Sequence, residues 1–205
     1  TFLELYLPKF RYVRYGEKGE PLFARFGSFS DARLGNGFIM SGYSNELFLP
    51  GQRIFGGNLD IDGRLFNFPY LGIETVIGNV AKFDVTAARL FTRPLAWMDA
   101  PLLPALQIGA TVAADTNPFL HTVRDPDSDF TDANTPDDSV TMFGFDTLLP
   151  IFSNNIASMA TYADIAFQNG KTGGMVGAGG RLIGIFVYSA QIRAFQDNFV
   201  PNYFD

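Results

Sequence analysis

The sequence predicts an all-β fold of about 12 antiparallel strands in up-and-down order, closed into a transmembrane β-barrel. Apolar residues alternate with small or polar ones over long stretches, as in strands with two different faces. Turn formers are abundant, with 21 Gly and 12 Pro. Charged residues make up only 18 % of the chain although 47 % of it is apolar. Soluble domains usually carry about 25 % charged residues.

The composition also excludes several classes of protein. The apolar content is too high for a disordered chain, and a chain without Cys has no disulfide framework. The net charge of -6 argues against sequence-independent binding of nucleic acid, which would need a basic stripe. A membrane-spanning helix is excluded because the longest uncharged stretch, residues 147–163, contains Pro150, Asn154 and Asn155.

The first third of the chain contains short strand candidates separated by turn residues. The sequence Gly-Glu-Lys-Gly-Glu at 16–20 and the dipeptide Asp62-Gly63 are typical of tight turns between antiparallel strands. The strands expected around them are residues 11–16, 22–28, 37–44, 58–61 and 64–68.

A further hairpin turn is predicted at Ile77-Gly78-Asn79. Only an odd number of loop residues keeps the apolar side chains of the two flanking strands on one face. This register places Glu74 opposite Lys82 on the polar face, so we expect these two residues to form an ion pair.

The longest alternation lies in the second half of the chain. In residues 106–115, 157–168 and 186–196, apolar side chains occupy one face and small or polar side chains occupy the other. A four-residue turn at 169–172 leads into the Gly-rich strand 173–180, whose glycines would make room for side chains opposite.

A last strand candidate, 140–148, follows the longest and most acidic connection, residues 115–139. We expect this connection to lie outside the membrane, because carboxylates are costly in hydrocarbon. The other long connections are 45–53 and 93–104, and no linker divides the chain. Residues 1–205 are therefore expected to form a single β-barrel domain.

Long alternating strands bury their apolar face either against a second sheet or against lipid. Crossing a bilayer takes about 9 to 11 residues per strand, which matches the alternating stretches. The polar face is rich in Gly, Ala, Ser and Thr with single charges, which suits a crowded barrel interior. Phe and Tyr often fall at strand ends, like the aromatic girdles of membrane barrels. A soluble sandwich or lipocalin-like barrel is the alternative.

Three segments, at 14–27, 34–45 and 196–205, resemble stretches of porin-like outer-membrane β-barrels of diderm bacteria, an uncharacterised family. The resemblance lies in the general sequence pattern and not in a single motif, and it covers most of the chain. It implies a location in the bacterial outer membrane and the lipid bilayer as partner, and it assigns no functional residue. Such barrels commonly end on an aromatic residue, whereas this chain ends on Asp205.

Charged residues on the predicted polar face are the candidate functional residues. In a barrel they would project into the lumen, where they either set ion selectivity or neutralise one another in a closed lumen. These lumen-lining candidates are Glu74, Lys82, Asp84, Asp164, Arg181 and Arg193.

The sequence gives no support for catalysis, so we expect neither an enzyme nor a cofactor. The sole His, His121, has no Cys to share a zinc site with, and no Gly-x-Ser-x-Gly motif occurs. Carboxylates in the long connection are two and three residues apart, as calcium ligands often are, but the Gly and Glu of an EF-hand loop are missing. These weak calcium candidates are Asp125, Asp127, Asp129 and Asp132, and a solvated acidic loop is the alternative.

Three functions are compatible with the sequence. The first is an outer-membrane barrel that passes small solutes passively through a polar lumen. The second is a structural or surface-interaction barrel with a filled lumen, and the third is a soluble β-protein that binds an apolar ligand. None of them involves nucleic acid. The membrane hypotheses predict that the apolar residues of 157–168 and 186–196 are exposed, with Asp164 and Arg193 on the interior.

The two ends of the sequence suggest a part of a larger barrel. A start at Thr1 is expected after removal of a signal peptide or in an internal piece. Residues 199–205 are typical of a loop followed by the beginning of another strand. We therefore expect that strands follow Asp205, or that residues 1–7 pair with the strand ending near Gln196.

Overall fold

The computed structural model describes residues 11–47, 49, 53–118, 139–201, 203 and 204, which form 12 strands and two short 3-10 helices. The all-β prediction is confirmed. No helix among the described residues is long and apolar enough to cross a membrane. The strands are β1 (Tyr12–Tyr15), β2 (Leu22–Gly27), β3 (Ala32–Arg33), β4 (Ser41–Tyr43), β5 (Gly56–Asp62), β6 (Leu71–Ile77), β7 (Val85–Thr92), β8 (Gln107–Asp115), β9 (Val140–Ser153), β10 (Ala157–Gln168), β11 (Lys171–Leu182) and β12 (Phe186–Phe195), and the helices are η2 (Gly63–Phe66) and η3 (Leu103–Ala105).

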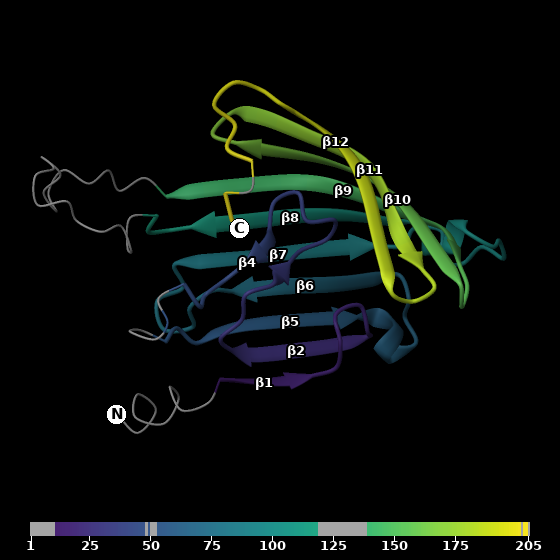
Figure 1. Ribbon diagram of the computed structural model, residues 1–205, viewed down its shortest axis with the longest axis horizontal. Coiled ribbons are helices and arrows are strands. Elements are labelled where there is room, and N and C mark those ends of the chain that lie inside the picture. The colour runs from purple at the N-terminus through teal and green to yellow at the C-terminus, as the bar shows by residue number, and fades with distance from the viewer. Residues whose placement is uncertain (1–10, 48, 50–52, 119–138, 202, 205) are drawn as a thin grey trace, which may run out of the picture.

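Ten strands form a single sheet in the order β1-β2-β5-β6-β7-β8-β9-β10-β11-β12, and β3 and β4 form a separate pair. Every pair of neighbours in the large sheet is antiparallel. Apart from the insertion of β3 and β4, the spatial order is therefore the up-and-down order predicted. The described strands form an open sheet with β1 and β12 at its two edges, not a closed ring (Figure 1).

One face of the sheet, the outer face, is apolar. Phe145 of β9 lies opposite Ile165 of β10, and Val176 of β11 lies opposite Ile192 of β12. These four side chains are 42–74 % exposed. The predicted exposure of the apolar positions is confirmed for Ile165 and Ile192, as it is for Phe186 and Tyr188, whereas Met159 and Phe167 are half-buried.

The inner face is covered in part by residues 28–45, which we call the inner segment and which include β3 and β4. In Figure 1 this segment passes in front of the central strands, on the side where the C-terminal end lies. Its apolar side chains and those of the C-terminal residues form the buried core together with apolar side chains of the sheet. The larger members of the core are Phe29, Leu34, Phe38, Ile39, Met40, Val76, Met142, Met175, Phe199 and Phe204.

Asn45 fastens the inner segment to the sheet. Its buried side chain accepts a hydrogen bond from the Phe29 amide at 2.8 Å and donates to the carbonyls of Gly27 and Gly78, each at 3.1 Å. Because Phe29 lies near the start of the segment and Asn45 ends it, this side chain closes the segment into a loop. Both ends of the loop are thereby held near the end of β2 and the end of β6.

The two-residue turn predicted at Asp62-Gly63 and the strand predicted at 64–68 are wrong, although β5 does pair antiparallel with the next strand, β6. Asp62 is the last residue of β5, and its carboxylate accepts a hydrogen bond from the Arg64 amide at 2.9 Å, which starts η2. The Phe68 amide then donates to the Gly63 carbonyl at 2.9 Å. Because η2 and the turn after it follow β5, the strand β6 begins only at Leu71.

The predicted ion pair of Glu74 with Lys82 is also wrong. The Phe83 amide donates to the Asn79 carbonyl at 2.8 Å, and the Ala81 amide donates to the Asn79 side chain at 3.0 Å. This local turn extends the connection to residues 78–84. As a result Glu74 lies opposite Arg89, and Lys82 is exposed in the connection.

The turn after β10 is shorter than predicted. Asn169 and Gly170 adopt φ values of 48° and 76°, and Gln168 pairs with Lys171 across a two-residue turn. Gly177 consequently lies opposite Tyr162. A Cβ atom on Gly177 would lie 2.6 Å from the Tyr162 ring, so this glycine makes room for the tyrosine, as predicted for the Gly-rich strand.

Candidate functional site

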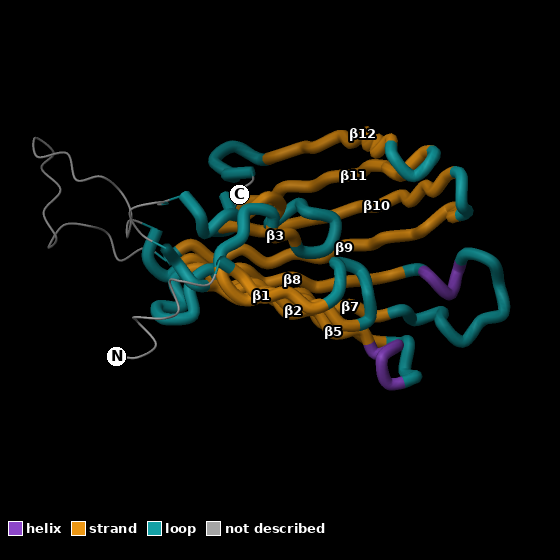
Figure 2. Tube along the Cα trace, turned by 60° about the horizontal axis from the view of Figure 1, so that its bottom comes forward, coloured by secondary structure: helices purple, strands orange, loops and turns teal. Residues whose placement is uncertain are grey.

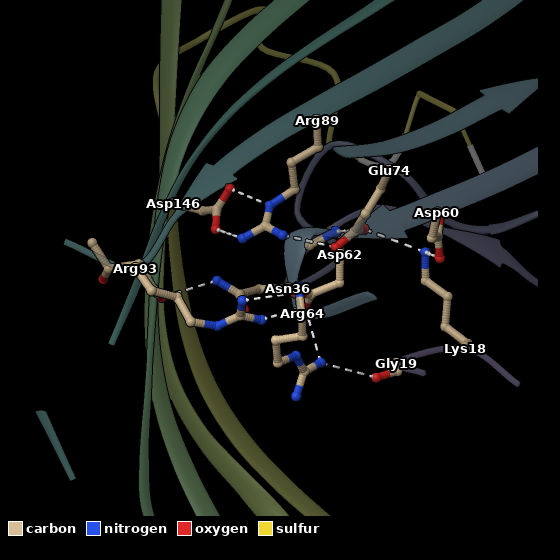
Figure 3. Close-up of polar contacts among 12 residues, drawn as sticks. Lys18, Gly19, Asn36, Asp60, Asp62, Arg64, Glu74, Arg89, Arg93 and Asp146 are labelled. Atoms are coloured by element: carbon tan, nitrogen blue, oxygen red, sulfur yellow. Dashed lines mark hydrogen bonds and ion pairs between the residues drawn. The ribbon is translucent and has the colours of Figure 1, made fainter. Parts of the chain in front are cut away.

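The inner face carries a network of eight charged side chains, four basic and four acidic, which we call the ion network (Figure 3). Its acidic members come from the strands β5, β6 and β9. The members are Lys18, Asp60, Asp62, Arg64, Glu74, Arg89, Arg93 and Asp146.

Arg89 of β7 stands at the centre of the network and is only 1 % exposed. Its Nε and Nη2 atoms donate to the two carboxylate oxygens of Asp146 at 2.9 and 2.6 Å, and its Nη1 atom donates to Glu74 at 2.8 Å. Such bidentate geometry with a second carboxylate is what offsets the cost of burying a guanidinium.

Glu74 links this centre to the β1–β2 connection. Its Oε2 atom accepts hydrogen bonds from the Gly35 amide at 3.0 Å and from Lys18 at 3.3 Å. The Lys18 ammonium also lies 2.7 Å from Asp60. Glu74 therefore joins the sheet, the inner segment and the Lys18 turn in one set of charged contacts.

Asp62 and Arg93 form a second bidentate pair. The Arg93 guanidinium donates to the two Asp62 oxygens at 3.1 and 2.6 Å, and Arg64 lies 2.9 Å from the same carboxylate. Both guanidinium groups contact the ring of Phe91, with the Arg89 and Arg93 guanidinium carbons 4.9 and 5.0 Å from its centroid. These cation–π contacts connect the two halves of the network.

Glycines on neighbouring strands provide the room for the large side chains. A Cβ atom on Gly109 would lie 2.4 Å from Asp146 Oδ2 and 2.7 Å from Arg89 Nε. A Cβ atom on Gly72 would lie 2.2 Å from the Phe91 ring. Gly109 therefore makes room for the ion network itself, and Gly72 makes room for the Phe91 ring that contacts its two arginines.

Two polar hollows lie on the inner face. The first has a volume of about 230 Å³ and is lined by most of the ion network together with Glu20. Its charged lining residues are four basic and four acidic, so the fixed charges balance. The second is larger, about 770 Å³, and lies between the inner segment and the strands β9 to β12. Figure 2 shows these last strands rising away from the rest of the sheet.

A further polar cluster lies at the ends of the strands. The Tyr203 hydroxyl donates to Asp115 Oδ2 at 3.2 Å, and burial together with the Asp115 charge raises the pKa of Tyr203 to about 12. Burial, with the charges of Asp84 and Asp115, also raises the pKa of Tyr43 well above its usual value. Both tyrosines are thus neutral hydrogen-bonding groups at ordinary pH.

The structure places four of the six predicted lumen-lining residues on the inner face and two in a connection. Glu74, Asp164 and Arg193 lie on the inner face, with Asp164 accepting a hydrogen bond from Asn36 at 3.1 Å. Arg181 is exposed and lines the larger hollow. The remaining two, Lys82 and Asp84, belong to the connection before β7; Lys82 is exposed, and Asp84 is buried beside Asn79.

Sequence reasoning missed the central arginines and Asp146. Alternation could have placed two of them, since Arg89 and Asp146 alternate with Leu90 and Phe145, which are exposed on the outer face. Their pairing could not be read in the same way, because they are 57 residues apart and meet only across β8.

The described residues contain no group of three or more His, Asp or Glu side chains arranged to hold a metal ion. The calcium candidates Asp125, Asp127, Asp129 and Asp132, and also His121, lie outside the described residues. The side chains of the ion network are occupied with one another, so the arrangement suits fixed electrostatic structure better than proton transfer or nucleophilic attack.

Comparison of the chain with protein-family models, with curated proteins and with solved structures finds no match. The resemblance to porin-like barrels therefore stays a prediction.

Proposed function

We propose that this chain forms the wall of a porin-like β-barrel in the bacterial outer membrane and lets small solutes pass through a polar lumen. The main observation in support of this proposal is the orientation of the two faces of the sheet. Apolar side chains occupy the outer face, where no second sheet of the described residues packs on them, while the buried charges lie on the inner face. A protein folded for water would have the opposite arrangement.

The energetics favour lipid as the covering of the outer face. Full burial of one large apolar side chain is worth about 1.5–3 kcal/mol, so a continuous row of uncovered ones is costly in water. Leu90, Val112, Phe143, Phe145, Val176 and Ile192 are each about half exposed or more. Contiguous apolar patches of this kind mark membrane or protein contacts.

Strand length supports the same proposal. The strands β8 to β12 contain 9, 14, 12, 12 and 10 residues. A tilted strand needs about 9–11 residues to cross a bilayer. Closure of the barrel is part of this proposal, and it requires the free edges of β1 and β12 to find hydrogen-bonding partners.

A second candidate function is a barrel with a filled lumen that serves as a structural or surface-interaction protein. The packing of the inner segment favours it, because Phe38 and Met40 are buried against the inner face of the sheet. The larger hollow distinguishes the two candidates: passage requires that it connect the two ends of the barrel. An apolar-ligand protein has less support, since the apolar face points out of the fold.

The proposal is tested by folding the full chain into phospholipid vesicles and measuring swelling in isosmotic solutions of small sugars. Vesicles that contain the protein should swell faster than protein-free vesicles. Insertion without swelling would favour the filled barrel, and failure to insert would contradict a membrane barrel of either kind.

A matched pair of variants makes the insertion step specific. Ile192→Arg places a charge on the outer face, where it should reduce insertion, because a lipid-facing arginine costs about 2–4 kcal/mol at the bilayer midplane. Gln191→Arg places the same charge one residue away on the inner face and should insert like the unchanged chain. Equal insertion of both variants would contradict the assignment of faces.

A further inference from the structure

Two neighbouring turns at one end of the sheet expose aliphatic side chains. The turn 154–156 joins β9 to β10, and the turn 183–185 joins β11 to β12. Their side chains Ile156, Ile183 and Ile185 are 68–74 % exposed. We call these three residues the apolar tip. Single exposed apolar residues are common on protein surfaces, but a group of them indicates a contact with something apolar.

Hydrogen bonds hold the two turns together. The Ile183 amide donates to the Ile156 carbonyl at 2.6 Å, next to the paired residues Ala157 and Leu182. The Asn154 side chain accepts from the Ile156 and Ala157 amides at 2.9 and 2.8 Å. Figure 2 shows the two turns side by side at the same end of the sheet. The three isoleucines therefore belong to one surface and not to independent loops.

The backbone of Ile183 shows that an isoleucine at this position has a cost. Its φ value is 52°, in the left-handed region that a β-branched residue rarely adopts. The next residue, Gly184, has a φ value of 71°. The turn after β10 has nearly the same φ values, 48° and 76°, but uses Asn169 and Gly170. Because Asn tolerates this conformation better than Ile, we infer that the exposed Ile183 side chain serves a contact outside the chain.

The chemistry around the apolar tip favours lipid over protein as its partner. Residues 153–160 and 180–188, which contain the two turns and the strand ends beside them, include one charged residue, Arg181. The hot spots of protein–protein interfaces are rich in Trp, Tyr and Arg, whereas the tip consists of isoleucines alone. A cationic residue beside aliphatic ones suits a leaflet of anionic lipids, because the headgroups attract the guanidinium and the acyl chains cover the isoleucines.

The rest of this end of the sheet agrees with a membrane contact. The apolar outer face reaches the tip, since Leu182 and Phe186, on either side of the turn 183–185, are both exposed. Trp97 is exposed in the connection between β7 and β8 at the same end, and Trp is enriched where a membrane meets water. The strand β9 begins at Val140, directly after the acidic connection, so that connection joins it at the end opposite to the tip.

We propose that the apolar tip lies in the boundary between the headgroups and the acyl chains of an anionic lipid leaflet and anchors this end of the sheet there. The inference rests on the membrane location proposed above, but it requires neither passage of solutes nor a closed barrel. Ile183 then exchanges some stability of its turn for contact with lipid. Its replacement by Asn should therefore weaken the anchor without weakening the fold.

Fluorescence quenching on the full chain in vesicles of phosphatidylglycerol and phosphatidylcholine tests this proposal. The chain has no Cys, so an environment-sensitive dye can be attached at Ile185→Cys, or at Lys171→Cys as the matched control at the other end of β11. Lipids with a nitroxide on the upper part of the acyl chain should quench the dye at 185 several-fold more than the dye at 171. Omitting phosphatidylglycerol should reduce the quenching at 185, and unchanged quenching would contradict the anionic leaflet as partner.

Substitutions in the labelled protein make the test specific. Adding Ile156→Ser and Ile183→Asn to Ile185→Cys should remove most of the quenching at 185. The control Phe83→Asn also replaces an exposed apolar residue of positive φ, but in the connection 78–84 at the opposite end of the sheet, and should leave the quenching unchanged. Circular dichroism checks that each variant is folded; if the double substitution is not, Ile183→Asn alone is compared with Phe83→Asn.

Equal quenching at 185 and 171, or quenching at 185 that survives the tip substitutions, would overturn the proposal. A dye at 185 that is shielded from both the lipid label and aqueous iodide would also overturn it, because a protein partner or a second copy would then cover the tip. Vesicle swelling without preferential quenching at 185 would refute the anchor alone. Preferential quenching without swelling would refute passage and leave the anchor in place.

Discussion

The substitution Arg89→Met tests the ion network at its centre. It removes three charged hydrogen bonds, two to Asp146 and one to Glu74, and replaces a buried guanidinium with an apolar side chain of similar length. Glu74 keeps Lys18 and the Gly35 amide as partners. Asp146, only 5 % exposed, loses both hydrogen bonds from the guanidinium. Most of the cost therefore arises at Asp146.

Removing one partner of a buried ion pair typically costs about 3–5 kcal/mol. We expect Arg89→Met to lower the free energy of unfolding by that amount. The double variant Arg89→Met/Asp146→Leu should recover at least about 1–2 kcal/mol, because it removes the uncompensated carboxylate as well. The control Arg14→Met breaks an exposed ion pair with Glu17 and should cost at most about 1 kcal/mol.

Urea unfolding in detergent micelles, followed by circular dichroism, measures these differences. A loss below about 1 kcal/mol for Arg89→Met would refute the reasoning, because it would show that Asp146 is satisfied without the arginine. The same conclusion would follow if the double variant were less stable than Arg89→Met.

Three further predictions concern packing and titration. Gly109→Ala should destabilise the fold by about 1–3 kcal/mol, because the added Cβ would overlap with Asp146. The control Gly174→Ala should be tolerated, because its added Cβ would have its nearest contact at 3.5 Å. Equal unfolding midpoints of the two variants would contradict this account of the packing. Phe38→Ala should cost about 3–5 kcal/mol, because it removes a buried ring stacked on Phe195 and Phe199, and an unchanged urea midpoint would show that the inner segment is not part of the core. The raised pKa of Tyr203 means that its stabilising effect is complete below about pH 10 and is lost as the pH rises through about 12. The Tyr203→Phe variant should therefore lack one late-titrating phenol in an ultraviolet titration. Loss of an early-titrating phenol would be inconsistent with the hydrogen bond from Tyr203 to Asp115.

The sequence was informative where a single strand decides the outcome. Side chains in a strand alternate between two faces, so the alternation in residues 157–168 places Ile165 on the outer face and Asp164 on the inner one. The same rule places Arg193 inward and Ile192 outward on β12. These predictions needed no knowledge of which strands are neighbours.

Predictions that depended on turn lengths were less successful. The pairing of Glu74 with Lys82 required a three-residue turn, but the hydrogen bonds around Asn79 build a longer one, and a changed loop length changes every partner across the hairpin. The inner segment was equally hard to foresee. Residues 37–44 have the composition of a strand, yet only β4 forms there, because the segment folds back over the sheet and is fastened by Asn45.

Orientation of the two faces is the central claim, and spin-label accessibility on β12 measures it most directly. The chain has no Cys, so single cysteines at Ser189, Ala190, Gln191 and Ile192 can be labelled one at a time in vesicles. Labels at 190 and 192 should collide with oxygen, which concentrates in lipid, and labels at 189 and 191 should collide with a water-soluble nickel chelate. Uniform accessibility along the strand, or the reverse alternation, would contradict a sheet whose apolar face contacts the membrane.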